Sequence, residues 1–495
     1  MDTILFTHSY FLRFDPKQWR LGQPYPPLGT LYAAALMREK GFRVGLFDTM
    51  FAESPDEILE AIEHHHPRWL VIYDDGFNYL TKMCLTNMRE AAFRMSRLAK
   101  EKGCRVVVSS SDSTDHFVEY LEQGADFVVI GEGEQTLLEL IGRDGGSPGL
   151  PGLAFLRDGL PVKTGGRAVM KDLDALPLPA WDLVEMERYR ATWMRHAGYF
   201  SLNMSTTRGC PFKCNWCAKP IYGNRYHARS PGQVVNEMKW LKERYAFQHI
   251  WFCDDIFGLK PGWVSEFADL LEQEGLRIPF KIQSRADLLL QEDYVRALAR
   301  AGCENSWMGA ESGSQRILDA MDKGTTVEQI EKATGLLKTN GIRPSFFIQF
   351  GYPGETKEDI RKTLRMINEL LPDEIGISVS YPLPGTVFYE KVKADLSKKA
   401  NWTDSDELQI MFRNTYAPPF YKQLHRYVHL SYRLHKALHS LKSLLQKPGA
   451  VSWLHVRKAV SLACHTPALV FAKWKLDRLG SRSSGAAIDL ITPRQ

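Results

Sequence analysis

The chain has 495 residues, which is too long for one ordinary hydrophobic core and predicts two or three domains. Its composition, 44% hydrophobic and 24% charged residues, excludes general disorder, and its net charge of +5 does not indicate a nucleic-acid partner. No apolar run is long enough to cross a bilayer, and the N-terminus lacks the features of a secretory signal. We therefore expect a cytoplasmic protein.

The first 145 residues alternate short apolar runs with amphipathic stretches. This alternation is typical of an α/β domain built on a doubly wound, flavodoxin-like parallel sheet. Such a sheet binds ligands beyond the carboxyl ends of its strands, so residues 1–145 are predicted to form a ligand-binding, Rossmann-like domain. The predicted strands are 3–6, 42–47, 68–73, 104–109 and 125–130.

Three further regions follow this domain. Residues 146–195 are rich in Gly and Pro, which indicates a linker with one hairpin. Residues 196–395 contain six strand–helix units, which predict a partial (β/α)6 TIM-type barrel with its active site at the carboxyl ends of the strands. Residues 396–495 are predicted to be helical, and their segment 421–482 is basic, with twelve Lys and Arg residues against one acid, Asp477.

Three of the eight cysteines lie together in "CPFKCNWC", at Cys210, Cys214 and Cys217, directly after the first barrel strand. This distribution excludes a disulfide framework. Three thiolates without a nearby fourth ligand do not suit structural zinc, whereas an iron–sulfur cluster with one open iron is held by cysteine thiolates in this way. A zinc site completed by His227 or Cys253 is the alternative.

A C-x-x-x-C-x-x-C motif in this position resembles the radical S-adenosylmethionine (SAM) superfamily over roughly residues 195–395. The segments "FCDDIF", "QSRADLL", "GAESGS", "FGYPGET" and "YPLPGT" resemble its other motifs, each at the end of a predicted strand. The resemblance implies a 4Fe-4S cluster on the three cysteines, which are then the catalytic metal ligands. It also implies SAM-binding roles for Trp216, Asp254, Gln283, Ser284, Arg285, Glu311 and Gly351.

Two of these assignments have structural alternatives. Arg285 is equally consistent with a salt-bridged barrel residue, and Asp254, like Asp255, with a cap of the helix that follows.

The N-terminal domain resembles the cobalamin-binding domain of many radical SAM enzymes, in residues 26–48 and 125–140. The loop "SSSDST" replaces the usual Gly-Gly-x-His-like turn, and D-x-H-x-x-G is absent, so no histidine is assigned to cobalt. A sheet that has kept its shape and binds no ligand is the alternative. The resemblance implies cobalamin contacts from Pro27, Leu28, Gly29, Tyr73, Phe77, Ser109, Ser110, Gly131, Glu132 and Gly133.

Together these resemblances imply a cobalamin-dependent radical SAM C-methyltransferase. It would methylate an unactivated carbon of a small-molecule or lipid-like metabolite through a 5′-deoxyadenosyl radical and methylcobalamin. An oxidative cyclase similar to the anaerobic magnesium-protoporphyrin ester cyclase, a ring-rearrangement enzyme, or a cobalamin-binding sensor module are the alternatives. The implied partners are a small-molecule substrate and an external reductant of the flavodoxin or ferredoxin type. No nucleic acid is expected, and the basic C-terminal region leaves contact with a membrane or another anionic surface open.

Overall fold

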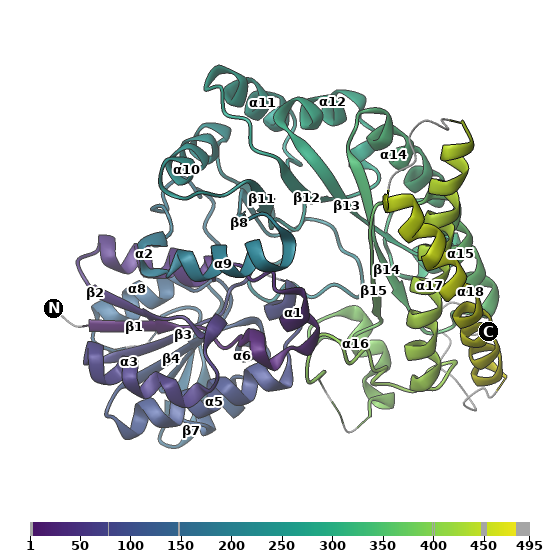
Figure 1. Ribbon diagram of the computed structural model, residues 1–495. Coiled ribbons are helices and arrows are strands. Elements are labelled where there is room, and N and C mark those ends of the chain that lie inside the picture. Colours follow the sequence, from purple (N-terminus) through teal and green to yellow (C-terminus); the bar gives the residue numbers. More distant parts are fainter. Residues whose placement is uncertain are drawn as a thin grey trace.

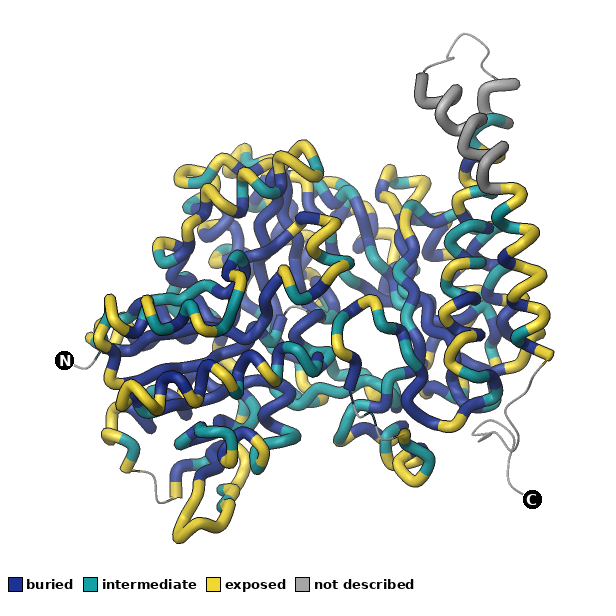
Figure 2. Tube along the Cα trace, turned by 60° about the horizontal axis from the view of Figure 1, so that its bottom comes forward, coloured by how far each residue is buried: buried dark blue, intermediate teal, exposed yellow. Residues whose placement is uncertain are grey.

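The computed structural model describes residues 3–77, 79–146, 149–397, 399, 401–446 and 453–481. Figure 1 shows an N-terminal α/β half beside a barrel-like half, with two long C-terminal helices packed along the outer side of the second half. Figure 2 shows that buried residues follow the strands of both halves, whereas exposed residues lie on the surrounding helices and loops. No helix in the described ranges is both long and apolar enough to span a membrane.

The N-terminal sheet has seven strands in the order β2-β1-β3-β4-β5-β6-β7. The first five are parallel, and their order confirms the predicted doubly wound, flavodoxin-like sheet. The predicted hairpin pairs antiparallel with β5 and therefore extends this sheet. The strands are β1 (Thr3–Thr7), β2 (Arg43–Phe47), β3 (Trp69–Tyr73), β4 (Arg105–Ser109), β5 (Phe127–Val129), β6 (Leu153–Arg157) and β7 (Leu160–Lys163).

Both faces of the parallel part of this sheet are buried, which explains why its strands are continuous apolar runs. Ile4 and Phe6 of β1 face one core, and Leu5 between them faces the other, because successive side chains of a strand point to opposite faces. The first core is covered by α2 (Leu28–Glu39) and α8 (Glu134–Gly142), and the second by α3 (Ile58–His65) and α5 (Thr86–Glu101).

The second sheet confirms the partial barrel. Its six strands are all parallel and follow one another in chain order, so the sheet curves without closing and leaves a gap between its first and last strands. The strands are β8 (Ser201–Met204), β11 (His249–Phe252), β12 (Phe280–Ser284), β13 (Cys303–Glu311), β14 (Arg343–Phe350) and β15 (Ile375–Val379). The main outer helices are α10 (Pro231–Arg244), α11 (Trp263–Gln273), α12 (Glu292–Ala301), α14 (Val327–Thr339) and α15 (Lys357–Leu370).

Two segments from opposite ends of the chain flank the gap in the barrel. Next to β8, the Tyr25 hydroxyl donates to Ser201 Oγ at 3.2 Å. Beyond β15, the ring of Tyr381 packs against Trp402 with centroids 4.5 Å apart. The two segments are joined because Ser405 Oγ donates to the buried Asp15 carboxylate at 2.9 Å.

The C-terminal region is helical, as predicted. Helices α17 (Pro418–Gln446) and α18 (Trp453–Gly480) pack side by side, and α17 also packs against α15 of the barrel. Gln423 of α17 donates to the carbonyl of Ala472 in α18 at 2.9 Å.

A buried arginine joins the two halves of the molecule. Arg208, at the end of β9 (Thr207–Arg208), forms ion pairs with Glu132 and, at 2.6 Å, with Glu134, and all three side chains are buried. Its guanidinium lies within 6 Å of three aromatic ring centroids, which belong to Tyr32, Phe77 and Tyr222. Since Arg208 stands two residues before Cys210, it connects the cysteine loop to the segment between β5 and α8.

Replacing Arg208 by methionine is expected to destabilise the protein strongly, because two buried carboxylates would lose their partner. The loss in free energy of unfolding should be about 3–5 kcal/mol, the usual cost of breaking a buried pair. Denaturant unfolding measures it. The matched control is Arg38→Met, which removes the solvent-exposed pair with Asp182 and should cost at most about 1 kcal/mol. Equal effects of the two substitutions would contradict a special role for Arg208.

Candidate active site

One large cavity connects the two halves of the molecule. It has a volume of about 790 Å³ and lies inside the barrel. It reaches the carboxyl edge of the N-terminal sheet, where Tyr10, Met50, Leu80 and Met83 line it from the loops after β1, β2 and β3. Ligands of both halves could therefore meet in one space.

The barrel strands line this cavity with alternate residues, as the pleat of a strand requires. Lys281 and Gln283 of β12 face it, as do Trp251, Trp307 and Phe347 from β11, β13 and β14. Trp307 and Phe347 have ring centroids 4.7 Å apart and form an aromatic wall. Polar side chains line the cavity both beside the cysteine loop and at the amino ends of the strands.

All three predicted cluster ligands line the cavity. Cys210, Cys214 and Cys217 are free thiols of intermediate exposure on the loop between β9 and β10 (His227–Ala228). Burial raises the pKa of Cys210 and raises that of Cys217 to about 12. The loop is fixed at Asn215, whose backbone N–H donates to the carbonyl of Met321 at 3.1 Å.

The zinc alternative needs a fourth ligand beside the three cysteines. Cys253, one of the two proposed fourth ligands, is buried and donates its thiol hydrogen to the carbonyl of Met204 at 3.1 Å.

Asp254 and Asp255 have different surroundings. The buried Asp254 carboxylate accepts hydrogen bonds from the backbone N–H groups of Thr206 and Thr207, both at 2.8 Å, so it supports the chain that leads to the cysteines. Burial raises its pKa to about 6. Asp255 lines the cavity and forms a 2.7 Å ion pair with Lys82, at the end of α4 (Tyr79–Lys82) in the N-terminal half. The SAM contact of Asp254 stays a prediction.

Gln283, Ser284 and Arg285 line the cavity together at the end of β12. The Arg285 guanidinium lies 3.6 Å from the ring centroid of Phe212 in the cysteine loop. It also forms a 3.0 Å ion pair with Asp287. Arg285 is therefore a salt-bridged barrel residue that also supports the cysteine loop at the cavity wall.

Glu311 faces the cavity from a distorted strand end. Its φ is +55°, and the register of β13 against β14 shifts between Gly309 and Glu311. The buried Lys323 ammonium binds the Glu311 carboxylate at 2.8 Å, and both residues line the cavity. Sequence reasoning missed Lys323, which lies in a turn with no periodic pattern. Trp216 also lines the cavity, and its buried indole N–H has no hydrogen-bond partner in the structure.

Gly351 is held against the C-terminal segment. Its φ is +79°, and an added Cβ would lie 2.8 Å from Ile410 and 3.0 Å from Tyr421. Its carbonyl accepts a 2.6 Å hydrogen bond from the Asn414 amide, and its N–H donates to the Glu355 carboxylate at 2.7 Å. Gly351 is absent from the residues that line the large cavity, so its SAM contact stays a prediction.

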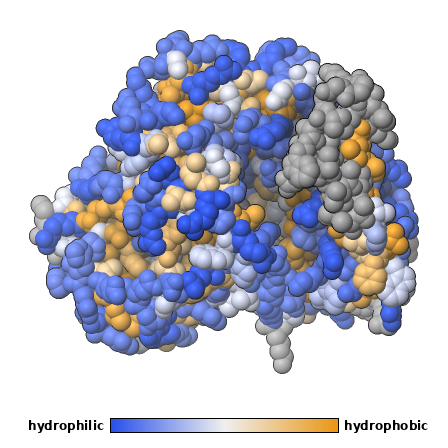
Figure 3. Space-filling model, viewed as in Figure 1, coloured by the Kyte–Doolittle hydropathy of each residue, from blue (hydrophilic) through white to orange (hydrophobic). Residues whose placement is uncertain are grey.

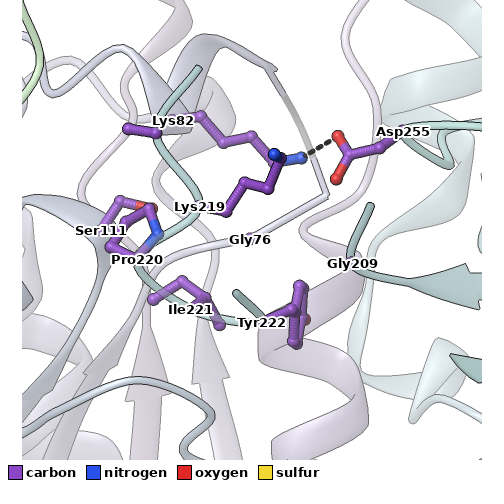
Figure 4. Close-up of a pocket in the computed structure, with 10 residues that line it drawn as sticks. Gly76, Lys82, Ser111, Gly209, Lys219, Pro220, Ile221, Tyr222 and Asp255 are labelled. Carbon is purple, nitrogen blue, oxygen red and sulfur yellow. Dashed lines mark hydrogen bonds and ion pairs between the residues drawn. The ribbon is translucent and has the colours of Figure 1, made fainter. Parts of the chain in front are cut away.

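A second, much smaller pocket lies between the N-terminal sheet edge and the cysteine loop. Its volume is about 20 Å³, and Lys219 and Asp255 line both it and the large cavity. Figure 4 shows Lys82 reaching across this pocket toward Asp255, with Ser111 and Tyr222 on its walls. The two halves are therefore in close contact where a ligand of the sheet would sit.

The predicted cobalamin residues lie around this edge. Gly133 packs so closely that an added Cβ would lie 2.8 Å from both Ser109 Oγ and the ring of Tyr73. Gly131 has a φ of +79°, which favours glycine. Glu132 is already paired with Arg208. The remaining predicted contacts are at the start of α2 (Pro27, Leu28, Gly29) and in the loops after β3 and β4 (Phe77, Ser110).

Two buried acids after β3 were not predicted. The Asp75 carboxylate accepts hydrogen bonds from the N–H groups of Gly29 and Phe77, at 3.2 and 3.0 Å. Asp74 accepts from the backbone and hydroxyl of Ser9, at 2.7 and 2.8 Å. They fix the loops at the sheet edge. The only sequence feature that could have pointed to them is a pair of acids directly after an apolar strand.

Comparisons with known proteins agree with this arrangement. The family model of the Radical SAM superfamily matches residues 204–367, and that of the B12 binding domain matches residues 20–141. An uncharacterized methyltransferase of Pyrococcus horikoshii is 29% identical over 394 residues, 77% of this chain and 82% of the relative. The anaerobic magnesium-protoporphyrin IX monomethyl ester cyclase of Synechocystis is 26% identical, over 80% of this chain and 78% of its own. Hopanoid C-3 methylase of Methylococcus capsulatus is 25% identical, over 86% of this chain and 79% of its own.

Two solved structures share the fold. The cobalamin-dependent SAM radical enzyme OxsB, with aqua-cobalamin bound, has a TM-score of 0.71 and 15% identity, and covers 97% of this chain and 77% of its own. The radical SAM methyltransferase TsrM from Kitasatospora setae, with cobalamin and a [4Fe-4S] cluster bound, has a TM-score of 0.64 and 19% identity. The match covers 79% of this chain and 78% of that structure's chain.

Glu355, beside Gly351, predicts a pH dependence of stability. Burial raises its pKa from 4.5 to about 8, so the unfolded chain releases this proton at lower pH than the folded chain does. Stability should therefore fall as pH rises from about 4.5 to about 8, with a limiting slope of about 1.4 kcal/mol per pH unit. Other buried acids, such as Asp254, contribute below about pH 6.

Glu355→Gln should flatten the profile between about pH 6 and pH 8, as measured by denaturant unfolding across that range. The exposed neighbour Glu358 provides the control, since Glu358→Gln should keep the wild-type slope. An unchanged slope in Glu355→Gln would show that another group is responsible.

Proposed function

Because this chain is a member of the radical SAM superfamily that also carries a B12 binding domain, we propose that it methylates an unactivated carbon of a small-molecule or lipid-like metabolite. The observation that carries this proposal is the single cavity of about 790 Å³, which joins the cysteine loop to the carboxyl edge of the B12-binding sheet. A methyl donor held at the sheet and a radical generated at the barrel could both reach a substrate placed there. This is the geometry that a two-cofactor methyl transfer requires.

Cys210, Cys214 and Cys217 are the proposed cluster ligands. Three free thiols on one loop, all at the cavity wall, suit a 4Fe-4S cluster, which is held by cysteine thiolates. When bound, the cluster supplies the electron that cleaves SAM. The protein holds the loop from three directions, through Arg208, Asp254 and the stacking of Arg285 on Phe212. An external flavodoxin- or ferredoxin-type reductant is the proposed electron source.

SAM is proposed to occupy the end of the cavity beside the cysteine loop. The Glu311 carboxylate can accept hydrogen bonds from ribose hydroxyls, and its 2.8 Å ion pair with Lys323 holds it in place. The unpaired Trp216 N–H and the Gln283 amide offer further polar groups on the same wall. These residues fit a ligand with hydroxyl, carboxylate and heterocyclic parts.

Cobalamin is proposed to bind at the sheet edge and, when bound, supplies the methyl group. Gly76, Gly131 and the hydroxyls of Ser109–Ser111 suit a site that a large ligand approaches closely. The pocket of about 20 Å³ holds only about one water, so binding requires Lys82 and residues 218–222 to move aside.

The substrate is proposed to lie against the aromatic wall. Trp251, Trp307 and Phe347 offer flat apolar surface to a planar or lipid-like body. The ammonium nitrogen of Lys281 lies 5.5 Å from the ring centroid of Tyr25 and 5.3 Å from that of Trp251. Lys281 forms no ion pair with any described residue. We infer that its ammonium binds an anionic or carbonyl group of the substrate.

Oxidative ring formation is the second candidate, because the Synechocystis cyclase is 26% identical over 80% of this chain. The two reactions differ in their products. Methyl transfer consumes a second SAM and yields S-adenosylhomocysteine, whereas cyclisation does not. Quantifying S-adenosylhomocysteine beside 5′-deoxyadenosine in anaerobic turnover therefore separates them.

Replacing Cys210, Cys214 and Cys217 by alanine should abolish iron binding and 5′-deoxyadenosine formation. Both are measured after anaerobic reconstitution with iron, sulfide and hydroxocobalamin, followed by SAM and a strong reductant. Cys104→Ala is the control, because this buried thiol lies beside β4, in the N-terminal half, and donates to the Pro67 carbonyl. Retained 5′-deoxyadenosine in the triple variant would exclude the cluster assignment.

Glu311→Gln should weaken SAM binding roughly 10- to 100-fold, the effect of losing about 1.5–3 kcal/mol of charge-assisted hydrogen bonding. Lys281→Gln should leave SAM affinity unchanged, because Lys281 is assigned to the substrate. Equilibrium dialysis of SAM with the cluster-loaded protein measures both. The assignment of the two ends of the cavity is wrong if Lys281→Gln loses SAM affinity and Glu311→Gln keeps it.

A further inference from the structure

Helix α18 has apolar residues on two opposite faces. Its inner face packs on α17 through the buried Ala472 and Leu476. On its outer face Val470, Phe471 and Trp474 are 66%, 59% and 55% exposed. In the described part of the chain these three large apolar side chains remain exposed side by side, and exposed apolar residues grouped in this way mark an interaction site.

The outer residues form one continuous stripe. Val470, Trp474 and Arg478 follow one another at intervals of four residues. Phe471 lies three residues before Trp474 and seven before Arg478, so all four positions are on the same side of the helix. The rings of Phe471 and Trp474 stack with centroids 5.7 Å apart, and the Arg478 guanidinium lies 5.7 Å from the Trp474 ring. Figure 3 shows apolar surface on the lower right of the molecule, where α18 lies in Figure 1.

Cations surround this stripe. Lys473, Lys475 and Arg478 are exposed within the same three turns, against the single acid Asp477. A purely apolar partner surface would remove these charges from water without compensation. An anionic lipid surface meets both requirements, since Trp and Phe favour the headgroup boundary while Lys and Arg extend to lipid phosphates.

We propose that the outer face of α18, formed by Val470, Phe471 and Trp474 with Lys473, Lys475 and Arg478, is a peripheral membrane contact for anionic phospholipid. The aromatic stripe enters the headgroup boundary, and the cations pair with lipid phosphates. The contact is independent of the reaction proposed for the cavity, so either proposal can fail alone.

Co-sedimentation of the full-length protein with lipid vesicles tests this surface. The protein is expected to bind vesicles of equimolar phosphatidylglycerol and phosphatidylcholine but not vesicles of phosphatidylcholine alone, and binding should weaken as salt is added. The double variant Phe471→Ser/Trp474→Ser should bind about tenfold more weakly, because the buried apolar area is lost. Lys473→Glu/Lys475→Glu should also lose binding.

Leu160→Ser is the matched control, because Leu160 is 69% exposed on the hairpin of the N-terminal sheet, away from the basic helix. It should bind vesicles as the wild type does, and circular dichroism should show that all variants stay folded. Two results would overturn the proposal. One is a wild-type protein that does not bind the anionic vesicles. The other is a dimer, seen by light scattering without lipid, that dissociates in Phe471→Ser/Trp474→Ser while vesicle binding is unchanged.

Discussion

The ion pairs of Arg208 with Glu132 and Glu134 join the two halves of the structure, and the geometry of the cavity depends on them. A buried guanidinium is stable only while its carboxylates stay in place, so the pairs fix the start of the cysteine loop to the segment that follows β5. The proposed cluster ligands therefore lie on one side of these ion pairs, and the proposed cobalamin site lies on the other. The cysteines follow Arg208 directly in sequence, and the glycines of the sheet edge flank its acidic partners.

The cavity that results has charged groups at two levels, with aromatic residues between them. Beside the cysteine loop it is lined by Glu311 and Lys323, which form an ion pair. Trp307 lines it from the middle of β13. At the amino ends of the strands it is lined by Glu304 and Arg343, which form a 2.8 Å ion pair. A molecule bound there therefore meets charged groups at both ends of the barrel and aromatic surface between them.

Local sequence patterns were sufficient to predict the strands and helices, but not the long-range contacts that join them. The order of the parallel strands and the open barrel follow from strand–helix alternation, and the three cysteines were visible because their spacing is local. Arg208 could not be recognised, because its partners are 76 and 74 residues away and nothing in a local pattern pairs them. Lys323 was missed because its segment has no periodic pattern, although its partner Glu311 is only 12 residues away. The contact of Asp75 with Gly29 spans 46 residues and was likewise invisible in a local pattern. The predicted ligand roles of Asp254 and Gly351 rested on motif position, whereas the first supports a loop and the second contacts the C-terminal segment.

The join between Asp15 and Ser405 also bears on how the protein is made. A ribosome that has finished the last barrel strand has already produced the whole sheet and all three cysteines, but not the C-terminal segment that flanks the gap in the barrel. N-terminal units fold first during synthesis. The nascent chain therefore holds both halves of the molecule before Ser405 emerges, and the join with Asp15 is among the last contacts that the growing chain can make.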